Sequence, residues 1–143
     1  MCQYIPTTLE WEWGGVPVTV KQDFDSESST SQPREPDGSV HRPQRWVVEL
    51  SVHCAQPTTF ALKLRLPWWL GGQAQVLVNG EPTPVSAGPS DFHEIRRTWQ
   101  GGTVRLVLGK ALSAMPLPEE RENVDLLYSV GVVGGLVCGG RGV

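Results

Sequence analysis

The stretch that decides the fold is WVVELSVHCAQPTTFALKLRL, residues 46–66. Apolar residues occupy every second position from Trp46 to Cys54, and again from Phe60 to Leu66. Successive side chains of a β-strand point to opposite faces, so this period of two places the apolar set on one face. We therefore predict two strands, 46–54 and 60–66, that supply much of a hydrophobic core.

Shorter segments with similar alternation lie on both sides of this stretch. The pair Asn79-Gly80 tolerates positive φ and suits a two-residue hairpin turn. The pattern from Phe92 to Arg96 requires a bulge, because Phe92 and Ile95 otherwise fall on opposite faces. The remaining expected strands are 9–13, 16–20, 76–78, 82–85 and 104–108. Together with turn signals about every ten residues, they predict an all-β fold, an antiparallel sandwich of about seven or eight strands.

Two regions depart from this pattern. Residues 25–44 are rich in Ser, Pro and charge and poor in apolar side chains, so we expect a mobile polar insert. From residue 119 a charged run leads into a Gly-rich apolar tail. We therefore predict a sandwich over 1–118 and, over 119–143, a linker and the incomplete start of a second β domain.

Charge, cysteines and hydropathy exclude several classes of partner. The twelve basic and fifteen acidic residues are mixed along the chain, so no basic stripe is available for nucleic acid.

Cys2, Cys54 and Cys138 are too far apart for a disulfide framework or a zinc motif, and we interpret them as reduced thiols, with Cys54 a small buried hydrophobe. The first residues lack signal-peptide features, and the apolar stretch 126–138 is too short to span a membrane. We expect a cytoplasmic chain with no membrane partner.

The six tryptophans raise the question of sugar binding, because an exposed indole can stack on a sugar ring. Trp11, Trp13 and Trp46 share strand faces with aliphatic residues, so we predict that they belong to the core. Trp68 and Trp69 lie at a bend, where we expect at least one exposed ring that docks on a partner domain or contacts sugar. We also predict that Trp99, just before Gly101-Gly102, closes one end of the core.

The polar residues do not form a convincing active site. Glu10 and Glu12 lie side by side on the polar face of a strand, an arrangement that is also found for the two carboxylates of a retaining glycosidase, but a solvated strand face explains them more simply. The three histidines, His41, His53 and His93, are scattered. We expect surface ion pairs between these carboxylates or Glu94 and the arginines Arg65, Arg96 and Arg97. We therefore assign no catalytic, metal-binding or cofactor-binding residue.

Several of these segments, taken in order, resemble glycoside hydrolase family 127, the β-L-arabinofuranosidase-like enzymes, in the region that follows the catalytic barrel. The matching segments are Tyr4-Ile5-Pro6 with Leu9-Glu10-Trp11, residues 60–67 with Trp69, residues 76–82, residues 94–99 before Gly101, Glu122-Asn123 and Leu136-Val137-Cys138. The chain departs from the family at the polar insert 25–44, at Gly101-Gly102 and at Gly134-Gly135.

The resemblance implies that catalysis belongs to another part of such an enzyme. The family is thought to use a zinc-held cysteine thiolate as nucleophile and a Glu as general acid/base, all on the helical barrel. Cys2 precedes Gln3 rather than a second Cys and a Pro, so the nucleophile is not carried onto it. The resemblance thus implies an inactive chain, which itself binds no cofactor.

Three functional hypotheses follow. The first, which we favour, is a non-catalytic accessory module, a fragment of the parent glycosidase, that packs against the barrel and stabilises it. The second is an independent carbohydrate-binding module, and the third is a complete small enzyme. Because both ends of the sequence leave apolar surface or strand edges, we also expect the isolated chain to self-associate through incomplete β edges.

Overall fold

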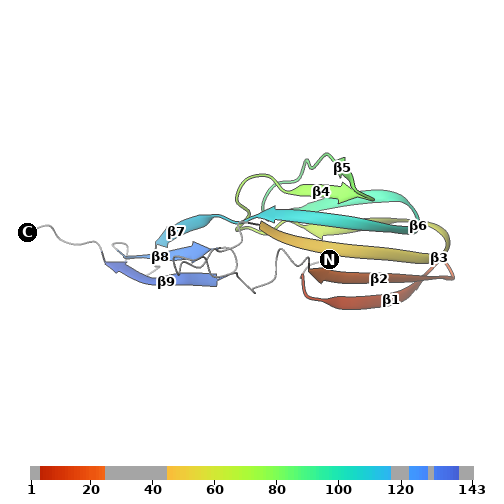
Figure 1. Ribbon diagram of the computed structural model, residues 1–143, viewed down its shortest axis with the longest axis horizontal. Helices are drawn as coiled ribbons and strands as arrows, with labels where there is room; N and C mark the ends of the chain where they lie inside the picture. The colour runs from red at the N-terminus through yellow and green to blue at the C-terminus, as the bar shows by residue number, and fades with distance from the viewer. Residues whose placement is uncertain (1–3, 25–44, 117–122, 129–130, 139–143) are drawn as a thin grey trace, which may run out of the picture.

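The computed structural model describes residues 4–24, 45–116, 123–128 and 131–138, and its regular elements are all antiparallel strands (Figure 1). Six of them form one sheet in the order β1-β2-β3-β6-β4-β5. These strands are β1 (Thr7–Trp13), β2 (Val16–Phe24), β3 (Arg45–Arg65), β4 (Gln75–Val78), β5 (Glu81–Thr83) and β6 (Phe92–Gly109). None of the described segments is a helix that could cross a membrane. The prediction of an antiparallel all-β fold is confirmed.

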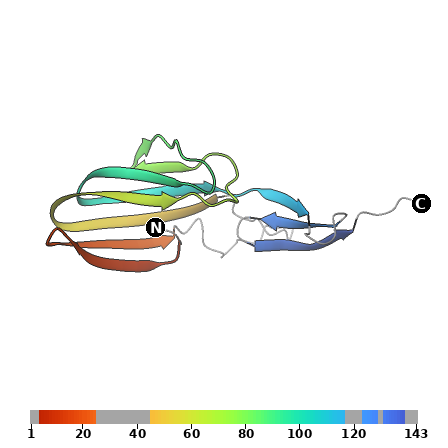
Figure 2. The same ribbon diagram turned by 180° about the vertical axis from the view of Figure 1, so that it is seen from behind.

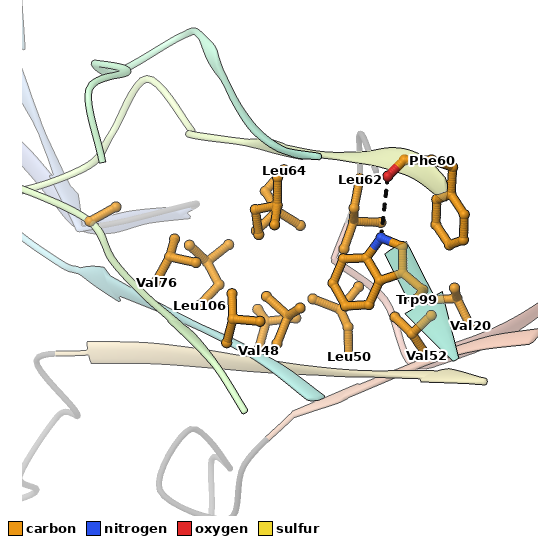
Figure 3. Packing of buried hydrophobic residues seen from close by; sticks show 14 of the residues in the cluster. Val20, Val48, Leu50, Val52, Phe60, Leu62, Leu64, Val76, Trp99 and Leu106 are labelled. Atoms are coloured by element: carbon orange, nitrogen blue, oxygen red, sulfur yellow. Dashed lines mark hydrogen bonds between the residues drawn. The ribbon is translucent and has the colours of Figure 1, made fainter. Parts of the chain in front are cut away.

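The finer prediction, a sandwich of seven or eight strands, is not confirmed, because two pairs of predicted strands are continuous. Segments 46–54 and 60–66 belong to the single strand β3, and segments 92–96 and 104–108 belong to β6. The β3–β6 register shifts between His53 and Thr58, which marks a bulge. In Figure 3 the two halves of β3 lie on opposite sides of the core, with Leu50 on one side and Leu62 on the other. One sheet therefore folds over itself and encloses its own core.

The core follows the period-two pattern of the sequence closely. The apolar residues at alternate positions of β3 and β6 are buried, and β2 and β4 add the same type of side chain. The buried cluster includes Val18, Val20, Val48, Leu50, Val52, Cys54, Phe60, Leu62, Leu64, Leu66, Val76, Val78, Ile95, Trp99, Val104, Leu106 and Leu108. The side chains labelled in Figure 3 meet between the two halves of the sheet. The prediction that β3 supplies much of the core is confirmed.

Two tight hairpins set the register of the short strands. Gly14 and Gly15 join β1 to β2 with φ angles of 59° and 79°, and Asn79 and Gly80 join β4 to β5 with φ angles of 53° and 84°. Positive φ at both central residues is the signature of the type I′ turn, whose twist matches that of paired strands. The predicted hairpin at Asn79-Gly80 is therefore confirmed, with a return strand shorter than the predicted 82–85.

A second, three-stranded antiparallel sheet follows the first. It contains β7 (Leu112–Pro116), β8 (Asn123–Tyr128) and β9 (Gly131–Cys138) in the order β7-β8-β9, and both views show it beyond one end of the first sheet (Figures 1 and 2). The Gly-rich tail thus pairs with β8, whereas the sequence left it without a partner. The insert 25–44 lies outside the described residues, and the domain boundary at 118 stays a prediction.

Candidate functional site

The bend of β3 and β6 is filled by an aromatic pair. Trp99 is 1% exposed, and its indole Nε1 donates a hydrogen bond to the main-chain oxygen of Phe60 at 3.2 Å. The two rings stack with centroids 5.8 Å apart and planes inclined by 26°. Figure 3 shows the two side chains and the hydrogen bond between the residues. The guanidinium carbon of Arg97 lies 5.1 Å from the Trp99 ring centroid. The prediction that Trp99 closes one end of the core is consistent with this burial.

Two further tryptophans reach Phe60 from the edge strand β1. Trp11 is partly buried and meets the Phe60 ring edge-on at 6.0 Å, so its predicted place in the core holds. Trp13 approaches the same ring at 6.5 Å but is 52% exposed, so the prediction for Trp13 is wrong. The physical reason is that β1 is the outermost strand of the sheet, and the strand pattern alone does not reveal which strand lies at an edge.

A second aromatic cluster joins Phe24, Trp46 and Trp69. The Trp46 and Trp69 rings stack at 5.6 Å with an interplanar angle of 13°, and Phe24 approaches Trp46 at 5.5 Å. The ammonium of Lys110 lies 5.8 Å from the Trp46 ring centroid, and burial lowers the pKa of Lys110. Trp68 is exposed beside them. The expectation that at least one ring of the 68–69 pair is exposed is therefore confirmed for Trp68, while Trp69 covers the core.

The acidic pair on β1 has no base opposite it in the sheet. Glu10 and Glu12 are exposed, and their partners across the β1–β2 ladder are Thr19 and Pro17. Burial of a carboxyl group or a cationic neighbour is what tunes a pair of carboxyls into an acid and a nucleophile. The pair therefore resembles a solvated strand face more than a catalytic site.

The histidines and cysteines do not converge either. His53 is exposed on β3, His93 is buried on β6, and His41 lies outside the described residues. Burial lowers the pKa of His93 and raises the pKa of the Cys54 thiol, which is free. No three His, Cys, Asp or Glu side chains in the described part of the chain could together hold a metal ion.

The ion pairs differ from those expected. Glu94 pairs with Lys63, whose Nζ lies 3.3 Å from the carboxylate, rather than with Arg65, Arg96 or Arg97. The reason is the register, because Lys63 and Glu94 are direct cross-strand partners in the β3–β6 ladder. Both side chains of the pair are more than a third exposed, so its contribution to stability is small.

Two hydrogen bonds that the sequence did not reveal fix the N-terminal segment. The Tyr4 hydroxyl donates to the main-chain oxygen of Arg65 at 2.6 Å. The buried Gln22 side chain donates through Nε2 to the main-chain oxygen of Ile5, also at 2.6 Å. The polar residue Gln22 at a core-facing position was the available signal, since a buried amide needs a partner.

A shallow pocket of about 390 Å³ lies on the outer face of the sheet. Glu49, Ser51, Leu77, Thr103 and Arg105 line it, and the Arg105 Nε lies 3.9 Å from a Glu49 carboxylate oxygen. This lining contains no aromatic ring for stacking on a sugar and no thiol.

The comparisons with known proteins agree with the sequence resemblance. A family model described as the middle domain of GH127 β-L-arabinofuranosidase matches residues 1–109. The chain belongs to this family. The matched region ends at Gly109, the last residue of β6, so it coincides with the six-stranded sheet. No curated protein matches the chain.

Solved structures show the same fold inside much larger enzymes. A GH127 β-L-arabinofuranosidase from Geobacillus stearothermophilus T6 is similar with a TM-score of 0.64 and 25% identity, over 88% of this chain. A glycoside hydrolase is similar with a TM-score of 0.64 and 23% identity, over 85% of this chain. The GH127 middle-domain chain spans 18% of the length of each of these two proteins.

The segments that suggested the family have identifiable structural roles in this middle domain. The Tyr4-Ile5-Pro6 segment supplies the hydroxyl and the carbonyl that fix the N-terminal segment to Arg65 and Gln22. The Asn79 side chain accepts a hydrogen bond from the Thr103 N–H at 2.9 Å and so ties the hairpin turn to β6. These roles concern the fold rather than catalysis.

Proposed function

We propose that this chain is a non-catalytic accessory module of a GH127 glycoside hydrolase, which packs against the catalytic barrel and stabilises it. The match of residues 1–109 to the middle domain of the β-L-arabinofuranosidase family carries this proposal. Because the chain spans 18% of the solved GH127 enzyme, most of such an enzyme lies in other domains. A partner that binds the folded module stabilises both, by mass action.

The chemistry of the described residues supports a role outside catalysis. The family resemblance implies a zinc ion with cysteine ligands, and this group does not fit the described residues. Cys54 is buried among apolar side chains, and no other Cys, His, Asp or Glu pair joins it to form a metal-binding group in the described ranges. Burial raises the pKa of the Cys54 thiol and so disfavours the thiolate that a nucleophile requires.

A binding experiment with a separately produced GH127 barrel tests the proposal. We expect the 143-residue chain to bind the barrel in calorimetry and to raise its melting temperature, while the chain alone does not hydrolyse a nitrophenyl arabinofuranoside. The absence of both binding and stabilisation would contradict the proposal. Micromolar binding to an immobilised glycan without barrel binding would instead identify an independent carbohydrate-binding module.

A further inference from the structure

Two tryptophans are almost equally exposed, but their surroundings differ. Trp13 is 52% exposed and Trp68 is 51% exposed. Trp68 lies in the turn after β3, and its neighbour Trp69 is the ring that packs on Trp46. Single exposed apolar side chains are ordinary on protein surfaces, whereas contiguous ones mark interaction sites. Trp13 is one of three large apolar residues at alternate positions of β1.

Leu9, Trp11 and Trp13 form what we call the β1 face. Leu9 and Trp11 lie directly across the ladder from Val20 and Val18, which are both buried in the core. Direct partners in a ladder point to the same side of a sheet, so the β1 face is a continuation of the core side. Leu9 is nevertheless 43% exposed. The apolar layer of the sheet therefore extends beyond the part that this domain covers itself.

The two edge strands of the sheet, β5 and β1, differ in length and in proline content. The edge strand β5 has three residues, and one of them is Pro82, which cannot donate to a further strand. The edge strand β1 has seven residues and no proline. Natural proteins shorten, charge or cover their edge strands, because a long apolar edge leads to aggregation. The edge at β5 is blocked by its short length and its proline, whereas the longer edge at β1 is protected by the charges of Glu10 and Glu12.

We propose that the β1 face is the surface by which the middle domain docks on the catalytic barrel of its enzyme. The inference rests on the proposed function and specifies where the contact lies. This domain spans 18% of the solved GH127 enzyme, and the catalytic barrel that the family resemblance implies would lie in the remainder. Its contact surface would present apolar side chains to Leu9 and Trp13, whereas Glu10 and Glu12 are exposed on the opposite side of β1 and lie outside this face.

A second copy of this chain fits β1 less well than the barrel does. Antiparallel pairing of two β1 strands would bring Glu10 and Glu12 of one copy beside the same residues of the other. Like charges directly opposite each other destabilise a ladder. The charges therefore oppose a symmetric dimer formed by pairing of two β1 edges.

Because Trp13 and Trp68 are almost equally exposed, substitutions at these two positions can be compared directly. Trp13→Ser and Trp68→Ser are introduced separately into the 143-residue chain, and the affinity of each variant for the GH127 barrel is measured by calorimetry. We expect Trp13→Ser to weaken binding at least about tenfold, as for a buried interface aromatic, and Trp68→Ser to change it less than about twofold. Leu9→Ser, which removes no ring contact with Phe60, should weaken binding as well, and circular dichroism checks that each variant is folded.

Each other outcome has a distinct meaning. If the wild-type chain binds the barrel but Trp68→Ser alone weakens binding, the turn after β3 is the docking surface and the inference is overturned, while the proposed function stands. Equal and small effects of Trp13→Ser and Leu9→Ser also overturn it. If the wild-type chain binds only itself and Trp13→Ser abolishes that, the occupant is a second copy. If the wild-type chain does not bind the barrel at all, the proposed function itself fails.

Discussion

Trp99 both stacks on the Phe60 ring and donates its indole N–H to the Phe60 main-chain oxygen, 3.2 Å away. Phe60 belongs to β3 and Trp99 to β6, and the ladder between these strands shifts register immediately before Thr58, the direct partner of Trp99. The pair thus fills the point where the sheet folds over itself. A single hydrogen-bonded ring at this point stabilises both the core and the bend.

The first prediction concerns this ring. Trp99→Ala should lower the free energy of unfolding by about 3–5 kcal/mol, because it leaves a large cavity in a buried position. Trp99→Phe, which keeps a ring but loses the indole donor, should have a smaller effect. Chemical denaturation monitored by far-ultraviolet circular dichroism measures both changes. A loss of less than about 1 kcal/mol for Trp99→Ala would show that the ring does not support the core.

The second prediction concerns pH and His93. Its Nε2 atom is buried without a hydrogen-bond partner among the described residues, and burial lowers its pKa below the ordinary value of about 6.5. A lowered pKa in the folded state means that protonation favours the unfolded state. The contribution of neutral His93 to the free energy of unfolding is therefore fully present above about pH 6.5. It decreases as the pH falls toward the lower pKa of the folded state.

The measurement compares two histidines. The free energy of unfolding of the wild type, His93→Leu and His53→Ala is determined between about pH 7.5 and 5.5. His93→Leu should lose part of the pH dependence, because the buried titrating group is gone. His53→Ala is the control for the loss of an exposed imidazole from β3. Identical pH profiles for the wild type and His93→Leu would contradict the assignment.

Features of the fold that depend on neighbouring residues could be predicted from the sequence, whereas features that depend on pairing between distant strands could not. The alternation over 46–54, 60–66 and 104–108 and the Asn79-Gly80 turn are local, and these predictions hold in the structure. The bulge expected between Phe92 and Ile95 is wrong, because the β3–β6 ladder is continuous from Phe92 to Trp99 and leaves Phe92 exposed while Ile95 is buried. The continuity of β3 through residues 55–59 is not local. Gln56 and Pro57 are typical of a turn and have no partner in the β3–β6 ladder, but pairing with β6 up to His53 and again from Thr58 keeps both flanks in one strand. Cross-strand pairing overrides local propensity here.

The exposure of the aromatic residues could not be predicted from the local sequence pattern either. Trp11 and Trp13 have the same pattern in the sequence, yet Trp11 packs on the core and Trp13 is half exposed. Which strand lies at the edge, and how far the opposing half of the sheet reaches, are properties of the topology. The sequence therefore identified the aromatic residues but not the surface that they form.

The third prediction concerns Gly102, where two chain segments approach closely. A Cβ atom at this position would lie 2.7 Å from the Asn79 Oδ1, which accepts the hydrogen bond of the Thr103 N–H. Gly102→Ala should therefore displace Asn79 and lower the free energy of unfolding by about 1–3 kcal/mol. At Gly101 the nearest atom to such a Cβ is 3.8 Å away, so Gly101→Ala should have a much smaller effect. Thermal denaturation compares the two variants, and equal losses would contradict the proposed crowding at Asn79.

The last prediction concerns Glu10 and Glu12, the two charged residues of the edge strand β1. If Glu10 and Glu12 oppose pairing of two β1 strands, the double variant Glu10→Thr with Glu12→Thr should self-associate at lower protein concentration than the wild type, in sedimentation velocity. Added salt should promote association of the wild type, because it screens the repulsion, and should change the association of the variant less. Glu81→Thr is the matched control, since Glu81 is an exposed acid on the edge strand β5, which Pro82 already blocks. If Glu81→Thr promotes association as strongly as the double variant, net charge rather than the β1 edge controls self-association, and the charge argument against a second copy at the β1 face loses its basis.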